Sequence, residues 1–116
     1  MQGINYNNLV RIHRIDSLFQ HMCSLGLLSI HIQLYGCNSL KDKRSLLKPL
    51  LARLHREFNI SVAEIGLQEN WGESQIVCVF VSNETDHTQQ ALQKILNWIE
   101  SLRMDFDVVS HQIEIL

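Results

Sequence analysis

Residues 28–35 alternate between apolar and polar side chains, and this alternation constrains the fold more than any other stretch of the chain. Leucine and isoleucine occupy every second position, and serine, histidine, glutamine and tyrosine fill the positions between them. A period of two predicts a β-strand with one face against a core. Gly36 and Asn38 then supply turn conformations, and Ser39 with Asp42 three positions later approximates a capping box. The strand is therefore expected to lead directly into a helix.

The helix expected after Ser39 is amphipathic. Its apolar side chains recur at about 100° per residue along one side: Leu40, Leu47, Leu50, Leu51, Leu54 and Phe58. Pro49 lies inside this pattern and removes one backbone hydrogen bond. Because the apolar stripe stays in phase across the proline, we expect one kinked helix and not two short ones.

The remaining elements follow from the same kind of pattern. Residues 60–68 predict a strand whose alternation slips near Ala63 and Glu64, which indicates an edge strand or a bulge. Residues 75–82 are apolar on both faces, as is typical of a central strand covered on both sides. A second amphipathic helix over residues 91–102 and an alternating strand over residues 108–116 complete the chain.

The six elements follow the order strand, helix, strand, strand, helix, strand, which is the ferredoxin-like βαββαβ arrangement. Right-handed crossovers place both helices on one face of an antiparallel four-stranded sheet of order 4-1-3-2. We therefore predict an α+β two-layer sandwich. A length of 116 residues suits one domain. We assign residues 22–116 to it and residues 1–21 to an N-terminal extension that forms a frayed or short helix.

Composition narrows the possible locations and cross-links. Cys23, Cys37 and Cys78 are odd in number and form no C-x-x-C pair, so neither a disulfide framework nor a zinc knuckle is indicated. No apolar run approaches the roughly 18–20 residues that cross a bilayer. The N-terminal residues also lack the compact apolar core of a signal peptide. We expect a cytoplasmic protein without a membrane partner.

No set of residues predicts a catalytic centre. A metal site formed by His31, Cys78 and His111 is conceivable, but the alternation of the strands turns the two histidines to opposite faces. Ser39 has no histidine or aspartate partner at a suitable spacing and fits a helix cap better. We expect no catalytic residue, no metal, no cofactor and no small-molecule substrate, and hence no enzyme.

Charge is distributed unevenly along the chain. The net charge is −2, but residues 1–56 carry +6 and residues 57–116 carry −8. Six of the ten basic residues fall between Lys41 and Arg56. Such a division indicates a cationic face for an anionic partner, with simple solvation of the charges as the alternative.

A basic stripe on the first helix is the best candidate for that cationic face. Lys41, Arg44 and Lys48 are spaced at i, i+3 and i+7, which places them on one side, and none has an acid at i+4. The strand over residues 75–82 has a single aromatic residue, so the sheet lacks the stacking signature of an RNA-recognition motif. Trp71 either stacks on a base or closes over the core. The residues that we predict to contact RNA are Lys41, Lys43, Arg44, Lys48, Arg56 and Trp71.

The competing hypothesis is a non-catalytic homodimer. Two helices on one side of a sheet leave the other side open, and an exposed apolar strip there often marks an interface. We predict Val77, Val79 and Val81 as interface residues, although the pattern of this strand does not say which of its faces is open. The N-terminal extension is an alternative cover for the same face.

Several short segments resemble one family of proteins. They are Gly36, S-L-K-D-K-R-S over residues 39–45, Leu50, F-N-I-S-V-A-E over residues 58–64, Trp71, and V-S-N over residues 81–83. These are similar to the YlxP-like family of small uncharacterised bacterial proteins, over about residues 22–116. The resemblance implies a ferredoxin-like fold. Because members often lie beside genes for translation initiation and ribosome maturation factors, it also implies a ribosomal RNA or ribosomal particle as partner. It carries over no catalytic residue. Members begin just before the first strand, so we expect the protein to start at Met22.

Overall fold

The computed structural model describes residues 23–116 and contains the predicted order of elements. They are β1 (Ser24–Leu34), α2 (Leu40–Glu57), β2 (Ser61–Gly66), β3 (Glu73–Ser82), α3 (Thr85–Ser101) and β4 (Phe106–Ile115). The four strands form one antiparallel sheet of order β2-β3-β1-β4, which is the predicted 4-1-3-2 order counted from the other edge. The predicted α+β sandwich is therefore confirmed. The extension over residues 1–21 and the start at Met22 lie outside the described residues.

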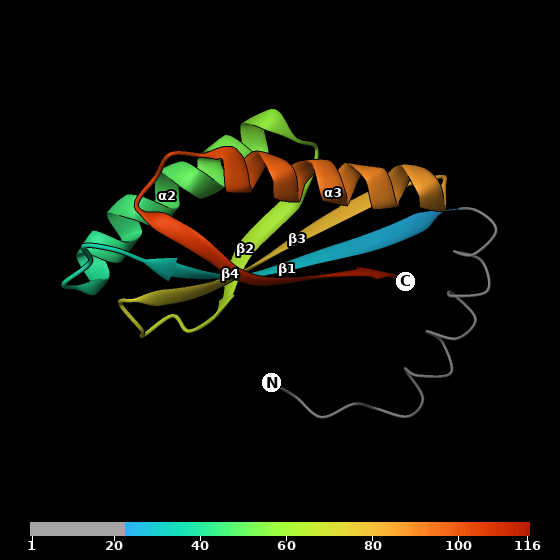
Figure 1. The fold of residues 1–116 in the computed structure, drawn as a ribbon. Helices are drawn as coiled ribbons and strands as arrows, with labels where there is room; N and C mark the ends of the chain where they lie inside the picture. Colours follow the sequence, from blue (N-terminus) through green and yellow to red (C-terminus); the bar gives the residue numbers. More distant parts are fainter. Residues whose placement is uncertain (1–22) are drawn as a thin grey trace, which may run out of the picture.

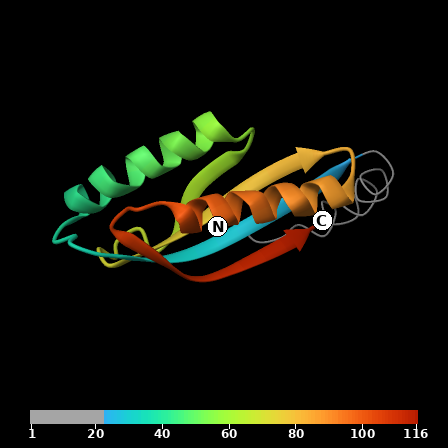
Figure 2. The same ribbon diagram turned by 45° about the horizontal axis from the view of Figure 1, so that its top comes forward.

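Both helices cover the same face of the sheet (Figures 1 and 2). α3 packs over β1, β3 and β4, whereas α2 packs mainly over the edge strand β2. The apolar positions of β1, which are Leu28, Ile30 and Ile32, are at most 1% exposed beneath the helices. No helix of residues 23–116 covers the opposite face, which we call the open face. The period-two pattern of β1 thus separates core from open face as predicted.

The start of α2 is built by the predicted turn and cap. Gly36 has a φ of 77°, a left-handed conformation that glycine adopts without steric cost. The Asp42 amide donates to Ser39 Oγ at 3.0 Å, and the Asn38 amide donates to Asp42 Oδ2 at 3.0 Å. The helix then continues past Pro49 to Glu57 as one element, so the prediction of a single helix is confirmed.

The two faces of β3 differ in burial. Ile76 and Cys78 are buried against the helices, whereas Val77 and Val79 are half-buried on the open face and Val81 is 61% exposed there. β3 is central, as predicted, but within residues 23–116 only its helix-facing side is covered. The slip predicted near residues 63–64 is a register shift between Glu64 and Gly66, on an edge strand.

Gly26 lies where β1 passes beneath α3, and the elements approach too closely there for a side chain. An added Cβ would lie 2.5 Å from Thr88 Cγ2 and 2.6 Å from Leu92 Cδ1. We expect Gly26→Ala to lower the free energy of unfolding by about 1–3 kcal/mol, as overpacking usually does. Gly72→Ala is the matched control, because its new carbon would meet only Asn70 Oδ1 at 3.7 Å. Equal urea midpoints for the two variants would contradict this account of the β1–α3 contact.

Candidate nucleic-acid interface

The outer side of α2 carries an exposed basic face. Lys41, Arg44 and Lys48 are all exposed, on the side turned away from the buried Leu50 and Leu54. Within residues 23–116 none of these three cations forms an ion pair. Their charges are therefore available to an anion in solution. We refer to these three residues as the basic face.

Arg56 lies at the opposite end of α2 from Lys41. Its Nε is 3.9 Å from Oε1 of the neighbouring Glu57, and both side chains are well exposed. A pair of this kind contributes little to stability. The neighbouring carboxylate nevertheless offsets part of the positive charge, so Arg56 is a weaker candidate for a phosphate contact than the basic face.

Lys43 does not belong to the basic face, although it lies between two of its residues in sequence. Its residue is 2% exposed, and its ammonium donates to the carbonyls of Leu67 and Asn70 at 2.6 Å each. The third contact is Glu64 Oε2 at 2.9 Å. An ammonium has three donors, and all three are used inside the protein. The expectation that Lys43 meets RNA is therefore corrected: its position on the core side of α2 turns the long side chain under the β2–β3 connection.

Glu64 extends this buried contact into the sheet. Its Oε2 also accepts a hydrogen bond from the hydroxyl of Ser74, a residue with no exposed surface. The charged pair is thus shared between α2, β2 and β3. A buried charge is costly unless it is paired and hydrogen-bonded, and here the ammonium of Lys43 meets both conditions.

The β2–β3 connection, residues 67–72, is held in one conformation. Leu67 has a φ of 63°, and Asn70 is bonded on both sides: Nδ2 donates to Glu73 Oε2 at 3.2 Å, and Oδ1 accepts from the Gly72 amide at 2.8 Å. Trp71 projects from this connection and is 50% exposed. Of the two roles expected for Trp71, closing over the core is therefore wrong. A half-exposed indole on a well-bonded loop is available for stacking.

A groove of about 340 Å³ separates α2 from the β2–β3 connection. On the α2 side it combines leucines with two cations of the basic face, and on the other side it has polar residues of the connection. Its lining residues are Leu40, Lys43, Arg44, Leu47, Lys48, Leu51, Glu64, Gln68 and Glu69. We call this feature the α2 groove. No sequence pattern predicted it, because its two sides are separated along the chain by the end of α2 and by β2.

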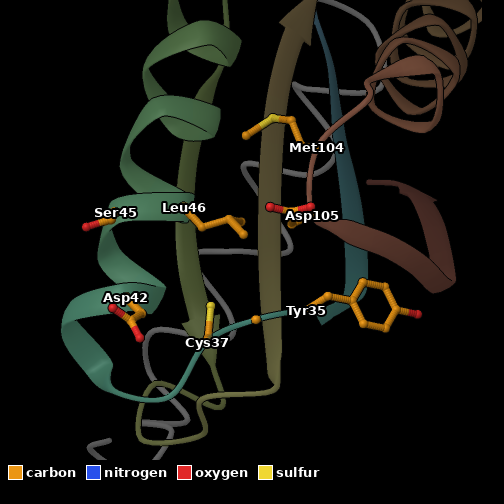
Figure 3. A pocket seen from close by; sticks show the side chains of 8 residues that line it. Tyr35, Cys37, Asp42, Ser45, Leu46, Met104 and Asp105 are labelled. Carbon is orange, nitrogen blue, oxygen red and sulfur yellow. The ribbon is translucent and has the colours of Figure 1, made fainter.

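A second hollow, of about 450 Å³, lies between the start of α2 and the α3–β4 connection (Figure 3). Burial and the nearby carboxylate of Asp42 raise the pKa of the Cys37 thiol in this hollow, which keeps it protonated at neutral pH. Ser45 Oγ donates to the Lys41 carbonyl at 3.1 Å, and Asp42 is engaged in the helix cap. Tyr35 turns away toward β4, where its hydroxyl donates to Asp107 Oδ2 at 2.7 Å. These polar groups serve local structure, and the thiol is not activated as a nucleophile.

The three residues considered for a metal site are separated by the sheet. His31 lies on the open face and its Nε2 is 2.9 Å from Glu73 Oε1. Cys78 is on the helix side, where burial raises its pKa to about 12. His111 pairs with Ile30 and so shares the helix-facing side of the sheet. Among residues 23–116 no three metal-binding side chains come together.

Neither helix in this part of the chain has the length and apolar content of a bilayer-spanning segment.

The valines predicted as interface residues share the open face. Leu25 pairs with Val81, and Leu27 pairs with Val79, so two apolar cross-strand pairs lie next to each other there.

The family of the protein can now be stated from its relatives. The family model described as "Protein of unknown function (DUF503)" matches residues 25–113. The chain belongs to this family. A Bacillus subtilis (strain 168) relative, "Uncharacterized protein YlxP", is 35% identical over 77 residues, which cover 66% of this chain and 84% of the relative. The YlxP-like resemblance is thereby confirmed.

Among solved structures, "De novo designed protein Foldit4" aligns over 81% of this chain and 96% of its own, with 18% identity and a TM-score of 0.49.

Lys43 should be required for stability in a way that the neighbouring cations are not. We expect Lys43→Met to lower the free energy of unfolding by about 3–5 kcal/mol, because the carboxylate of Glu64 and two carbonyls lose their partner. Lys48→Met, which changes an exposed cation on the same helix, should stay within about 0.5 kcal/mol. Chemical denaturation compares the two variants.

Replacing both partners of the ion pair, as in Lys43→Met with Glu64→Leu, should recover part of the loss, since no buried charge is then left alone. If Lys43→Met were as stable as Lys48→Met, the buried ammonium would not be the contact that holds the connection.

Proposed function

We propose that this protein is a non-catalytic, cytoplasmic accessory protein that binds RNA, with ribosomal RNA or a ribosomal particle as partner, through the basic face of α2. The observation that supports this most is the exposure of Lys41, Arg44 and Lys48 on one side of a helix, without an ion pair among residues 23–116. Three unneutralised cations on one side of a helix can neutralise several phosphates together and release their counterions on binding.

The charge of the rest of the domain also favours the approach of RNA from the side of α2. Residues 57–116 carry −8, so the surface that they form repels a polyanion. The basic face is then the side on which an RNA strand can approach. Contacts of this kind position a backbone without reading its sequence.

The exposed indole of Trp71 favours a single strand over a duplex. An aromatic side chain can stack only on a base that is free of its partner, and such stacking is worth about 1–3 kcal/mol per base. Lys43 bonds to the carbonyl of Asn70, so the backbone next to Trp71 is held against α2. A single strand that follows the basic face could therefore also reach Trp71.

Binding should depend on salt through the basic face. We expect the triple variant Lys41→Gln, Arg44→Gln and Lys48→Gln to bind single-stranded RNA more weakly, and to flatten the plot of log affinity against log salt by about two units. The fold should survive, because exposed substitutions cost about 0.5 kcal/mol or less each. The measurement is fluorescence anisotropy of a labelled mixed-sequence RNA, repeated with purified ribosomal subunits in a sedimentation assay.

The control carries Lys94→Gln and Arg103→Gln, which remove exposed cations from outside α2. It should keep the slope of the wild type. If the plots of log affinity against log salt superimpose for the wild type and the triple variant, or if neither protein binds RNA, the basic face is not the RNA-binding surface.

A second candidate function, homodimerisation through the open face, is supported by a different observation. Val77, Val79 and Val81 lie on that face beside Leu25 and Leu27, and no helix of residues 23–116 covers them. A row of apolar side chains on an uncovered sheet is the kind of surface that a second copy buries. The two candidates use opposite sides of the molecule and do not compete.

A charge on the open face should prevent such a dimer without unfolding the domain. We expect Val79→Lys to give a folded monomer, and Gln89→Lys, at an exposed position of α3 on the other side of the sheet, to remain dimeric. Cys78→Lys should unfold the protein, because it would bury an ammonium in the core. Sedimentation equilibrium gives the masses, and a wild type that is monomeric at high concentration would rule out this second function.

A further inference from the structure

We infer that the α2 groove is a subsite for one nucleotide of the bound strand, and that Glu69 makes this subsite selective for guanine. This inference rests on the proposed RNA binding and adds to it a position at which the sequence of the RNA is read. The basic face by itself contacts phosphates and cannot discriminate between bases.

The groove has the volume and the apolar lining of a small-ligand site. Its volume of about 340 Å³ is at the lower end of the range of about 300–1,000 Å³ found for such sites. Leu40, Leu47 and Leu51 line it from α2. Their apolar surface gives the flat face of a base a place to pack, while the edge of the base stays near the polar side of the groove.

The charges of the two sides suit a nucleotide whose base enters and whose phosphate stays outside. Arg44 and Lys48 belong to both the groove and the basic face, so a strand bound along α2 passes directly over the opening. Phosphate is attracted to these two cations and repelled by the carboxylate of Glu69 across the groove. The base is therefore the part directed toward the β2–β3 connection.

Glu69 supplies the acceptors that would read the base. It is exposed and, within residues 23–116, forms no ion pair, unlike Glu64, which is occupied by Lys43. A carboxylate only accepts hydrogen bonds, and its two oxygens can take a pair of parallel N–H donors. Guanine presents two adjacent donors, N1–H and the N2 amino group, on its Watson–Crick edge. Adenine, cytosine and uracil each place a donor next to an acceptor there.

The side of the groove that carries Glu69 is fixed in place before any ligand binds. Gln68 and Glu69 lie between the carbonyls of Leu67 and Asn70, and the ammonium of Lys43 holds both of those carbonyls at 2.6 Å. Gln68 is further tied by its Nε2, which donates to the Ile65 carbonyl at 3.0 Å. A preorganised wall loses little entropy when a base docks, which is the condition for selectivity at an open site.

The test uses three labelled RNA hexamers: hexauridylate, the same hexamer with guanosine at its two central positions, and the same hexamer with inosine there. Inosine lacks the N2 amino group and so keeps only one of the two donors. Anisotropy titrations should show the guanosine hexamer binding about tenfold more tightly than hexauridylate, the scale of one bidentate contact to a base. The inosine hexamer should lose most of that advantage, and all three should share one salt slope.

Two variants separate the subsite from the basic face. Glu69→Gln should abolish the guanosine preference, because its amide places a donor against guanine, while hexauridylate should bind at least as tightly as to the wild type, because a carboxylate that repels phosphate is removed. Glu84→Gln makes the same charge change at an exposed position before α3 and should leave the preference intact.

Equal affinity of the wild type for the three hexamers would overturn the subsite while leaving the proposed RNA binding in place. A guanosine preference that survives Glu69→Gln would overturn the role of Glu69. Absence of binding to all three hexamers, even at low salt, would reject the proposed function and the subsite together.

Discussion

The buried ammonium of Lys43 is the contact on which the outer surface of α2 depends. α2 packs mainly on an edge strand, and within residues 23–116 the hydrogen bonds between this helix and the β2–β3 connection all come from Lys43. Lys43 links the two, since its three donors reach a carboxylate of β2 and two carbonyls of the connection. An ammonium removed from water must find such partners, so the conformation of the connection and the position of the helix specify each other.

This contact also sorts the cations of α2 by role. Lys43 is fully paired inside the protein, whereas Arg44, one position later, is exposed and forms no ion pair within residues 23–116. The same connection presents Trp71 and Glu69 to solvent while its backbone is anchored from below. A surface that combines cations, an indole and a free carboxylate on well-bonded backbone is suited to a flexible polyanion, because the protein has little left to order on binding.

The two sides of the sheet differ in the surface that they present. The helices bury one side and carry the charges, while the other side exposes paired leucine and valine residues along β1 and β3. If two copies met through their open faces, each would keep its α2 on the outside. Two basic faces on one particle would then engage one long RNA with a higher effective concentration than either alone. The two candidate functions would in that case reinforce each other.

The sequence by itself determined the order of elements, the sheet order, the cap at Ser39 and the single helix across Pro49. All of these depend on local periodicity and turn chemistry, which a linear pattern contains. It also located Lys41, Arg44 and Lys48 on one exposed face, because helical spacing alone places them together. Only the tertiary structure removed Lys43 from that set, since its partners come from a connection more than twenty residues away. Likewise β3 is apolar on both sides, so its register against β1, and not its own pattern, decided that Val79 faces outward and Cys78 inward.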